Sequence, residues 1–293
     1  MYIPLMLIIN PFSGRGLTKT NLGGVVQALC GGGYAVTTYV AGELRCGELA
    51  ARYGSQYEVV ACIGGDGTLS DVIAGLVMLE NPPSVGYIPS GTANDVATSL
   101  ELPRDPNLAV QRILDGALVP LDVGVFAGEF FTYVAAFGAF TGVSYQTPQS
   151  AKRALGHLAY IFGGLADMAA IHPVHTIVEF DDGVIEDDFI FGGVTNSLSV
   201  AGLVRLEPRD VELADGLFEV LLVKNPVDLL AMGDILHSLL LRDYDNDNVR
   251  LLHTTRAKFT FDEDVAWTRD GENGGTHREV EITVKPGAIN IIV

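Results

Sequence analysis

Three glycine-rich turns, each between a short apolar run and a segment of helical spacing, constrain the first third of this chain most strongly. The strand-like apolar runs cover residues 5–9, 34–40, 58–63 and 84–88. Segments whose apolar residues recur at helical spacing separate or follow them, at residues 19–30, 47–53 and 69–79. Short apolar runs alternating with helices predict a parallel α/β sheet. Ligands of such sheets bind beyond the carboxyl ends of the strands, so we expect the site at the turns after Ile9, Ile63 and Ile88.

The pattern changes near residue 120, where strand-like runs follow one another with turn signals between most of them. Asp181-Asp182-Gly183 and Asp215-Gly216 are two of these signals. Two segments of helical character interrupt the strands, at residues 150–171 and 227–241. A length of 293 residues suits two domains. We therefore predict an α/β domain at residues 1–122 and an antiparallel β-rich domain at residues 123–293.

The three turns carry residues suited to binding phosphate. The first reads Asn10-Pro11-Phe12-Ser13-Gly14-Arg15-Gly16, the second Gly64-Gly65-Asp66-Gly67-Thr68, and the third Pro89-Ser90-Gly91-Thr92-Ala93-Asn94-Asp95. Glycines let backbone N–H groups approach a ligand closely, and the N-terminus of a helix favours anions. Each turn also has a structural explanation, as a tight turn or as a helix cap: Thr68 is a natural N-cap of the second helix, and Asn94 or Asp95 of the third. Together at one sheet edge they predict a phosphate site.

Asp66 adds information because a carboxylate beside a phosphate is repelled unless a cation lies between them. That position implies either Mg²⁺ or an ordered water network. An Asp-Gly turn followed by a helix cap is the structural alternative. No Gly-Lys pair exists in the chain, which excludes the ordinary P-loop.

Composition argues against several other classes of protein. The net charge of −18 makes nucleic acid a poor partner and opposes tight adhesion to anionic membranes. Three cysteines without close pairs, at positions 30, 46 and 62, suit buried thiols in a reducing cytoplasm. His172 and His175 are expected to be surface or packing residues. With no targeting segment and no run of ~18 apolar residues, we expect a soluble or peripheral protein.

The order and spacing of the three turns resemble the diacylglycerol kinase catalytic domain family, which includes bacterial soluble diacylglycerol kinases and sphingosine kinases. Further matches extend the resemblance over residues 10 to 272: Lys152 to Tyr160, Ala214 to Phe218, and Asp270-Gly271-Glu272. The resemblance implies a Rossmann-like three-layer α/β domain and an antiparallel β-sandwich domain, with the active site in the cleft between them. It implies phosphorylation of the hydroxyl of diacylglycerol or a related lipid alcohol, with ATP and Mg²⁺ as cofactors.

The resemblance also assigns roles to residues. Asp270 becomes the general base, with Glu272 and Asp66 as further catalytic residues. The remaining ATP-binding positions implied are Asn10, Pro11, Ser13, Gly14, Arg15, Gly64, Gly65, Gly67, Thr68, Gly91, Thr92 and Asn94. Mg²⁺ would be held by Asp66, Asp95 and Asp122, and a structural Mg²⁺ by Asp215, for which a plain Asp-Gly turn is the competing interpretation. The chain departs from the family pattern at Thr98, where an arginine is usual.

Two alternatives remain open beside a lipid kinase. NAD kinases share the second glycine-rich turn and the two-domain plan, although the third turn and the Asp270 turn fit lipid kinases better. A nucleotide-binding regulator without turnover is the other alternative.

Residues 154–170 are apolar and follow Lys152 and Arg153, so a helix there could lie on a membrane surface or pack on its own domain. We expect a cytoplasmic protein with transient membrane contact, no nucleic-acid partner, and a possible homodimer.

Overall fold

The computed structural model describes residues 2–13, 21–91, 94–138, 172–200, 204–206 and 211–293. The chain divides into two compact units. Unit 1 comprises Met1–Val123, Leu213–Asp215 and Lys285–Val293, and unit 2 comprises Gly124–Glu212 and Gly216–Val284. Each unit is therefore discontinuous in sequence, which a single boundary after residue 122 does not express. No helix in the described ranges is long and apolar enough to cross a membrane.

Unit 1 is built on a parallel sheet whose strands all follow the predicted apolar runs. Its strands are β1 (Ile3–Ile9), β2 (Tyr34–Val40), β3 (Val59–Gly64) and β4 (Ser84–Pro89), in the order β4-β3-β1-β2. β1 pairs in parallel with β2 on one side and β3 on the other, and β3 pairs in parallel with β4. The predicted parallel sheet is confirmed. β1 and β3 are buried on both faces, which explains why they read as continuous apolar runs rather than as alternating ones.

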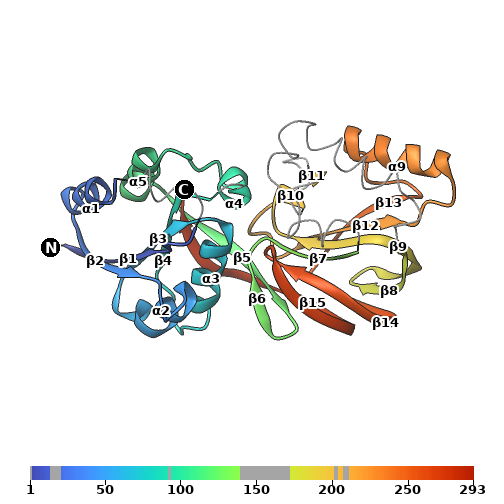
Figure 1. The fold of residues 1–293 in the computed structure, drawn as a ribbon, viewed down its shortest axis with the longest axis horizontal. Helices are drawn as coiled ribbons and strands as arrows, with labels where there is room; N and C mark the ends of the chain where they lie inside the picture. Colours follow the sequence, from blue (N-terminus) through green and yellow to red (C-terminus); the bar gives the residue numbers. More distant parts are fainter. Residues whose placement is uncertain (1, 14–20, 92–93, 139–171, 201–203, 207–210) are drawn as a thin grey trace. The chain divides into compact units, whose positions relative to one another are not determined.

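Helices cover both faces of this sheet (Figure 1). The helices of unit 1 are α1 (Leu22–Gly31), α2 (Cys46–Tyr53), α3 (Asp66–Leu76), α4 (Asp95–Ser99) and α5 (Pro106–Asp115). Side chains of α1 and α5 join one face of the sheet in a buried cluster that includes Leu7, Ala61 and Ile63. On α2 and α3 the backbones lie close together, since a Cβ on Gly75 would stand 2.2 Å from the carbonyl oxygen of Gly47. The three predicted helices are confirmed, and α5 was not predicted.

A late segment of the chain completes unit 1. The strand β15 (Glu272–Ile292) begins in unit 2 and ends in unit 1. Ile291 pairs in parallel with Val85 of β4, and Ile292 belongs to the same buried cluster as α1 and α5. The backbones of Ala117 and Val293 exchange two hydrogen bonds of 3.0 Å. The tail of β15 is thus an integral part of the α/β sheet.

Unit 2 is an antiparallel β structure, as predicted. The other strands with residues in it are β5 (Leu118–Phe126), β6 (Glu129–Phe131), β7 (Val134–Gly138), β8 (Val174–Phe180), β9 (Gly183–Thr195), β10 (Ser199–Val200), β11 (Val204–Arg205), β12 (Phe218–Lys224), β13 (Val249–Thr254) and β14 (Arg256–Arg269). β9 pairs with β7, β8 and β12, and β14 pairs with β7, β8 and β15. Aromatic side chains, among them Phe137, Phe259 and Trp267, fill the core between these strands.

Two helices were predicted in this half of the chain. The helix predicted at 227–241 is confirmed as α9 (Leu229–Leu241), which begins after Asp228, whose carboxylate accepts the Ala231 N–H. The helix predicted at 150–171 lies outside the described residues. The long strand β15 was missed, although the alternation of polar and apolar residues over 279–284 is the period of a strand.

Candidate active site

Three turns meet at the carboxyl edge of the parallel sheet in unit 1. β4, β3 and β1 are neighbours, so the residues that follow them lie side by side. The side-chain amide of Asn10 donates to Thr68 Oγ1 at 2.9 Å, which ties the first turn to the second. The hydroxyls of Ser13 and Ser90 lie 3.3 Å apart, which ties the first turn to the third. The predicted convergence is confirmed for the described residues, and Gly14, Arg15 and Thr92 lie outside them.

Glycine is required where the second and third turns approach each other. A Cβ on Gly91 would stand 2.6 Å from the Cα of Gly65, and a Cβ on Gly64 would stand 2.3 Å from the Thr68 side chain. Real Cβ atoms do not approach other heavy atoms so closely. The Ser90 N–H donates to the Gly64 carbonyl at 2.7 Å, so the close approach is held by a backbone hydrogen bond. These glycines therefore set the spacing of the turns.

Asn94 holds the third turn in shape. Its backbone is left-handed, with φ 53° and ψ 50°, a region that asparagine enters more readily than most residues. Its side-chain oxygen accepts the Gly91 N–H and its amide donates to the Gly91 carbonyl, both at 3.0 Å. The buried hydroxyl of Tyr87 donates to the Gly64 carbonyl at 3.3 Å, beneath the same turn. The side chain of Asn94 thus has a structural role in positioning Gly91.

Asp66 connects two helices. It is the first residue of α3, which is capped by Gly65, so the prediction that Thr68 is the N-cap is wrong. The two oxygens of the Asp66 carboxylate accept the backbone N–H groups of Asp95 and Val96, each at 3.1 Å. Asp66 therefore caps α4, for which the side chain of Asn94 makes no cap hydrogen bond. Burial raises the pKa of Asp66, and the backbone donors oppose that rise.

Two other predicted metal ligands, Asp122 and Asp215, lie outside the three turns. Asp122 is fully buried, and its carboxylate accepts the Gly287 N–H at 2.6 Å. Its own N–H donates to Leu213 in the turn that carries Asp215. Asp215 is exposed and precedes Gly216, whose φ of +81° suits an Asp-Gly turn. Across the described ranges, no group of three or more His, Cys, Asp or Glu side chains is arranged to hold a metal ion.

Asp270 lies in unit 2, in the two-residue turn between β14 and β15. Asp270 and Gly271 have φ of 48° and 79°, and Arg269 pairs with Glu272 across the turn, so this is a type I′ hairpin. Asp270 is 7% exposed, and its carboxylate accepts three backbone N–H groups. These come from Thr132 at 2.7 Å and from Tyr133 and Val134 at 3.0 Å.

The three amides give Asp270 a structural role that sequence reasoning missed. The carboxylate therefore anchors Thr132 and Tyr133, which lie between β6 and β7, and Val134, the first residue of β7. Glu272 is exposed at the start of β15. A signal for the structural role was present in the sequence, because Asp-Gly between two strand patterns is typical of a type I′ hairpin.

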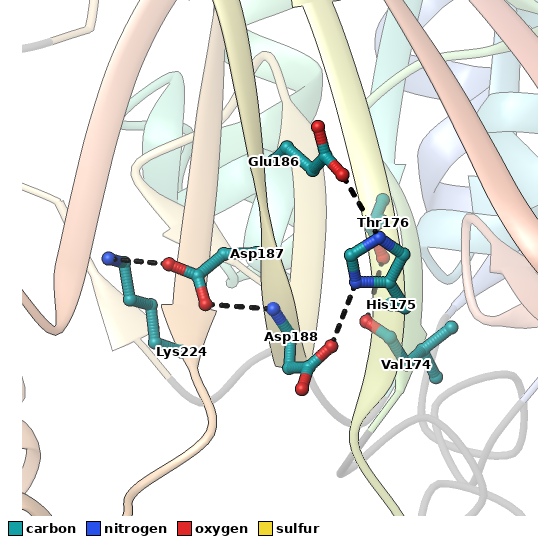
Figure 2. Close-up of polar contacts among 7 residues, drawn as sticks. All are labelled: Val174, His175, Thr176, Glu186, Asp187, Asp188 and Lys224. Atoms are coloured by element: carbon teal, nitrogen blue, oxygen red, sulfur yellow. Dashed lines mark hydrogen bonds and ion pairs between the residues drawn. The ribbon is translucent and has the colours of Figure 1, made fainter.

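An exposed ionic cluster lies on the adjacent strands β8 and β9 of unit 2 (Figure 2). The ring of His175 lies between two carboxylates, with Nδ1 3.0 Å from Asp188 and Nε2 3.3 Å from Glu186. Asp187, between them in sequence, pairs instead with Lys224 at 2.7 Å. The hydrogen bond with Asp188 is the main reason that the pKa of His175 is raised above its usual value. His175 is a surface residue, as expected.

An arginine near the third turn was also missed. Arg104 donates to Thr98 Oγ1 at 3.2 Å, and Thr98 in turn donates to the Asn94 carbonyl. Its place close to the turn could not be read from the sequence, because it depends on how the loop after α4 folds back.

Comparison with known proteins adds independent findings. A sequence model described as the diacylglycerol kinase catalytic domain matches residues 4–126. A second, described as the YegS C-terminal NAD kinase beta sandwich-like domain, matches residues 136–293. Diacylglycerol kinase of Bacillus subtilis is 31% identical over 92% of this chain and 89% of its own length. Diacylglycerol kinase of Staphylococcus saprophyticus is 34% identical over 92% of this chain and 88% of its own length.

Solved structures share the fold. A Bacillus anthracis structure described as a diacylglycerol kinase superposes with a TM-score of 0.77 at 22% identity, over 99% of this chain and 97% of that chain. An NAD kinase from Archaeoglobus fulgidus in complex with ATP gives a TM-score of 0.52 at 11% identity, over 99% of this chain and 93% of that chain. The NAD kinase fold is thus the more distant of the two.

Proposed function

Because this chain belongs to the diacylglycerol kinase catalytic domain family, we propose that it transfers the γ-phosphate of ATP to the hydroxyl of a lipid alcohol, diacylglycerol or a close relative. The observation that carries the proposal is the joining of three glycine-containing turns at one sheet edge in unit 1. Asn10 with Thr68, and Ser13 with Ser90, hold those turns together. The relatives at 31% and 34% identity are named diacylglycerol kinases.

The phosphates of ATP would lie on these turns. The N-terminus of α3, an eleven-residue helix that begins at Asp66, presents backbone N–H groups that suit phosphate oxygens. The positions proposed to line the nucleotide are Asn10, Pro11, Ser13, Gly14, Arg15, Gly64, Gly65, Gly67, Thr68, Gly91, Thr92 and Asn94. Thr68 is buried and tied to Asn10, so its role is to fix the first two turns. Arg104 joins this set as a nearby cation.

Mg²⁺ is proposed to accompany ATP. Mg²⁺ in kinases usually takes one or two carboxylates and completes its shell with phosphates and water, so a protein cage of three ligands is not needed. Asp66 and Asp95 supply hard carboxylate oxygens beside the turns, with Asp122 further along the chain. When bound, the ion would offset the negative charge of the phosphates. Asp215 is proposed as a ligand of a separate structural ion.

Asp270 is proposed as the general base, with Glu272 beside it. The Asp270 carboxylate is held rigidly by three backbone amides, and rigidity is what a group that aligns an attacking hydroxyl requires. The phosphoryl group would pass to the lipid hydroxyl as Asp270 accepts its proton. This step needs the active site to lie in a cleft between a Rossmann-like domain and the β-sandwich domain, which is part of the proposal.

The proposed location of the protein follows from its lipid substrate. A kinase of a lipid alcohol would be cytoplasmic and would touch the membrane transiently, and it could act as a homodimer. An NAD kinase activity is the second candidate, favoured by the NAD kinase beta sandwich-like model that matches residues 136–293 and by the shared fold at a TM-score of 0.52. A regulator that binds nucleotide without turnover is the third, suggested by Thr98 in the place of the usual arginine.

The test is a transfer assay with γ-labelled ATP and Mg²⁺ against diacylglycerol, sphingosine, prenyl alcohols and NAD. Labelled phosphatidic acid is the expected product. If NAD is the only substrate that takes up the label, the result would favour the NAD kinase activity. Nucleotide binding without any labelled product would support the regulator and refute the kinase proposal.

A further inference from the structure

Tyr133 contacts both residues of the turn that carries Asp270. Its backbone N–H donates to the Asp270 carboxylate at 3.0 Å. Its phenolic oxygen lies against Gly271, since a Cβ on that glycine would stand 3.3 Å from it. The proposed phosphoryl transfer uses the backbone of Tyr133 but gives its side chain no task. A polar side chain thus lies next to the proposed base, on the same turn.

The backbone of Tyr133 is fixed on both sides. While its N–H is held by Asp270, its carbonyl oxygen accepts the Thr195 hydroxyl at 2.5 Å and the Asn196 N–H at 3.2 Å. Thr195 is fully buried and Asn196 is 3% exposed, so little water reaches these bonds. With the peptide groups anchored, the position of the phenol depends on its two side-chain torsions. A tyrosine held in this way loses little conformational entropy when it binds a ligand.

Tyr133 is more accessible than the carboxylate that its backbone holds. It is half-buried and Gly271 is exposed, whereas Asp270 is 7% exposed. Gly271 has no side chain that could cover the phenolic oxygen. A phenol donates one hydrogen bond and accepts others without carrying a charge, so it costs less to desolvate than an ion does. These properties suit a group that binds an uncharged alcohol.

We propose that the Tyr133 hydroxyl binds the acceptor alcohol and aligns it with Asp270. The inference rests on the proposed function, because it takes Asp270 as the base. The alcohol oxygen would accept a hydrogen bond from the phenol and direct its own proton to the Asp270 carboxylate, which leaves a lone pair for the γ-phosphorus. As the new O–P bond forms and the bond to the leaving ADP breaks, the proton of the alcohol passes to Asp270. Tyr133 keeps its own proton throughout.

Tyr133→Phe removes the hydroxyl alone and tests this contact. The ring and the backbone N–H on Asp270 remain, so the melting temperature and the affinity for ATP should stay at their wild-type values. With dioctanoylglycerol as acceptor and γ-labelled ATP, kcat/KM for the lipid should fall about tenfold, as expected for the loss of one hydrogen bond. Calorimetry without ATP should show that the variant binds dioctanoylglycerol more weakly than wild type does.

Tyr57→Phe is the matched control. Tyr57 is also half-buried, and its hydroxyl lies 3.2 Å from that of Tyr39, in unit 1. It comes before β3, at the end of that strand opposite to the second turn. This change removes a phenolic hydroxyl without touching unit 2, so transfer to dioctanoylglycerol should equal that of wild type.

The two proposals fail in different ways. Wild type that transfers phosphate to no alcohol refutes the proposed function, and the role of Tyr133 falls with it. Active wild type with an equally active Tyr133→Phe refutes only the role of the phenol. So does a variant whose melting temperature and ATP affinity fall together with its transfer, because that result is what a packing role predicts.

Discussion

Asp270→Asn should destabilise unit 2 before it says anything about catalysis. Asparagine tolerates the left-handed backbone at this position, so the change isolates the carboxylate from backbone strain. In wild type, three backbone N–H groups point at the two carboxylate oxygens. An amide offers one oxygen, and its NH₂ group must then face at least one of those donors. The segment from Thr132 to Val134 therefore loses part of its support.

The magnitude follows from the hydrogen bonds. A hydrogen bond to a charged group contributes about 1.5–3 kcal/mol, and one to a neutral acceptor about half of that. Losing one such bond and weakening two others to half should lower the free energy of unfolding by about 3–6 kcal/mol. At about 2–4 °C per kcal/mol for a domain of this size, the melting temperature should fall by roughly 10 °C. Exposure of only 7% leaves little room for solvent to replace the lost acceptor.

Thermal unfolding followed by circular dichroism and calorimetry tests this. Asp264→Asn is the control: Asp264 lies on the neighbouring strand β14, pairs with Arg278 at 3.2 Å, and is well exposed, so its loss should change stability by less than about 1 kcal/mol. Equal melting temperatures for the two variants would refute the structural role of Asp270. Kinase activity of Asp270→Asn has meaning only below its own melting temperature, and loss of transfer there would support the proposed base.

Three further changes test other parts of the structure. Gly91→Ala should lower the free energy of unfolding by about 1–3 kcal/mol and weaken ATP binding, since its Cβ would stand 2.6 Å from the Cα of Gly65. Gly67→Ala is its control, because there is open space at its Cβ, and it should melt like wild type. Asp66→Ala should cost about 1–3 kcal/mol by uncapping α4 and should raise the KM for Mg·ATP; unchanged melting would contradict the cap. The raised pKa of His175 should appear above 6.5 in an NMR titration. Its contribution to stability is full below the unfolded pKa of about 6.5 and lost as pH rises through the folded pKa, so His175→Gln should differ from wild type more at acid than at alkaline pH; a difference that does not change with pH would contradict this.

The parallel sheet could be predicted because three of its strands, β1, β3 and β4, are almost wholly buried and its turns carry glycine. Residues 5–9 and 59–63 read as unbroken apolar runs for that reason. The meeting of the turns followed from strand order, which a parallel sheet restricts. The bonds between Ser13 and Ser90, or between Asp66 and the start of α4, could not be predicted, because they depend on side-chain positions that no periodicity encodes.

Prediction was less complete for the antiparallel half. Its strands are recognisable singly, but β15 was missed because it has no long apolar run. The three amides on Asp270 come from residues 136 to 138 positions away in sequence, and a contact of that range leaves no local signal. Thr68 was misjudged because a threonine after glycines resembles a cap, while Gly65 performs that role.

The return of β15 to the first sheet has a consequence for the order in which the molecule can mature during translation. Residues 285–293 leave the ribosome only after all of unit 2 has been made, yet Ile291 pairs with Val85 and Ile292 fills the cluster beneath α1 and α5. The sheet and core of unit 1 therefore stay incomplete until residues 285–293 have been made. A nascent chain halted before residue 285 should be readily cleaved by protease in its first 123 residues, however complete those residues are by themselves.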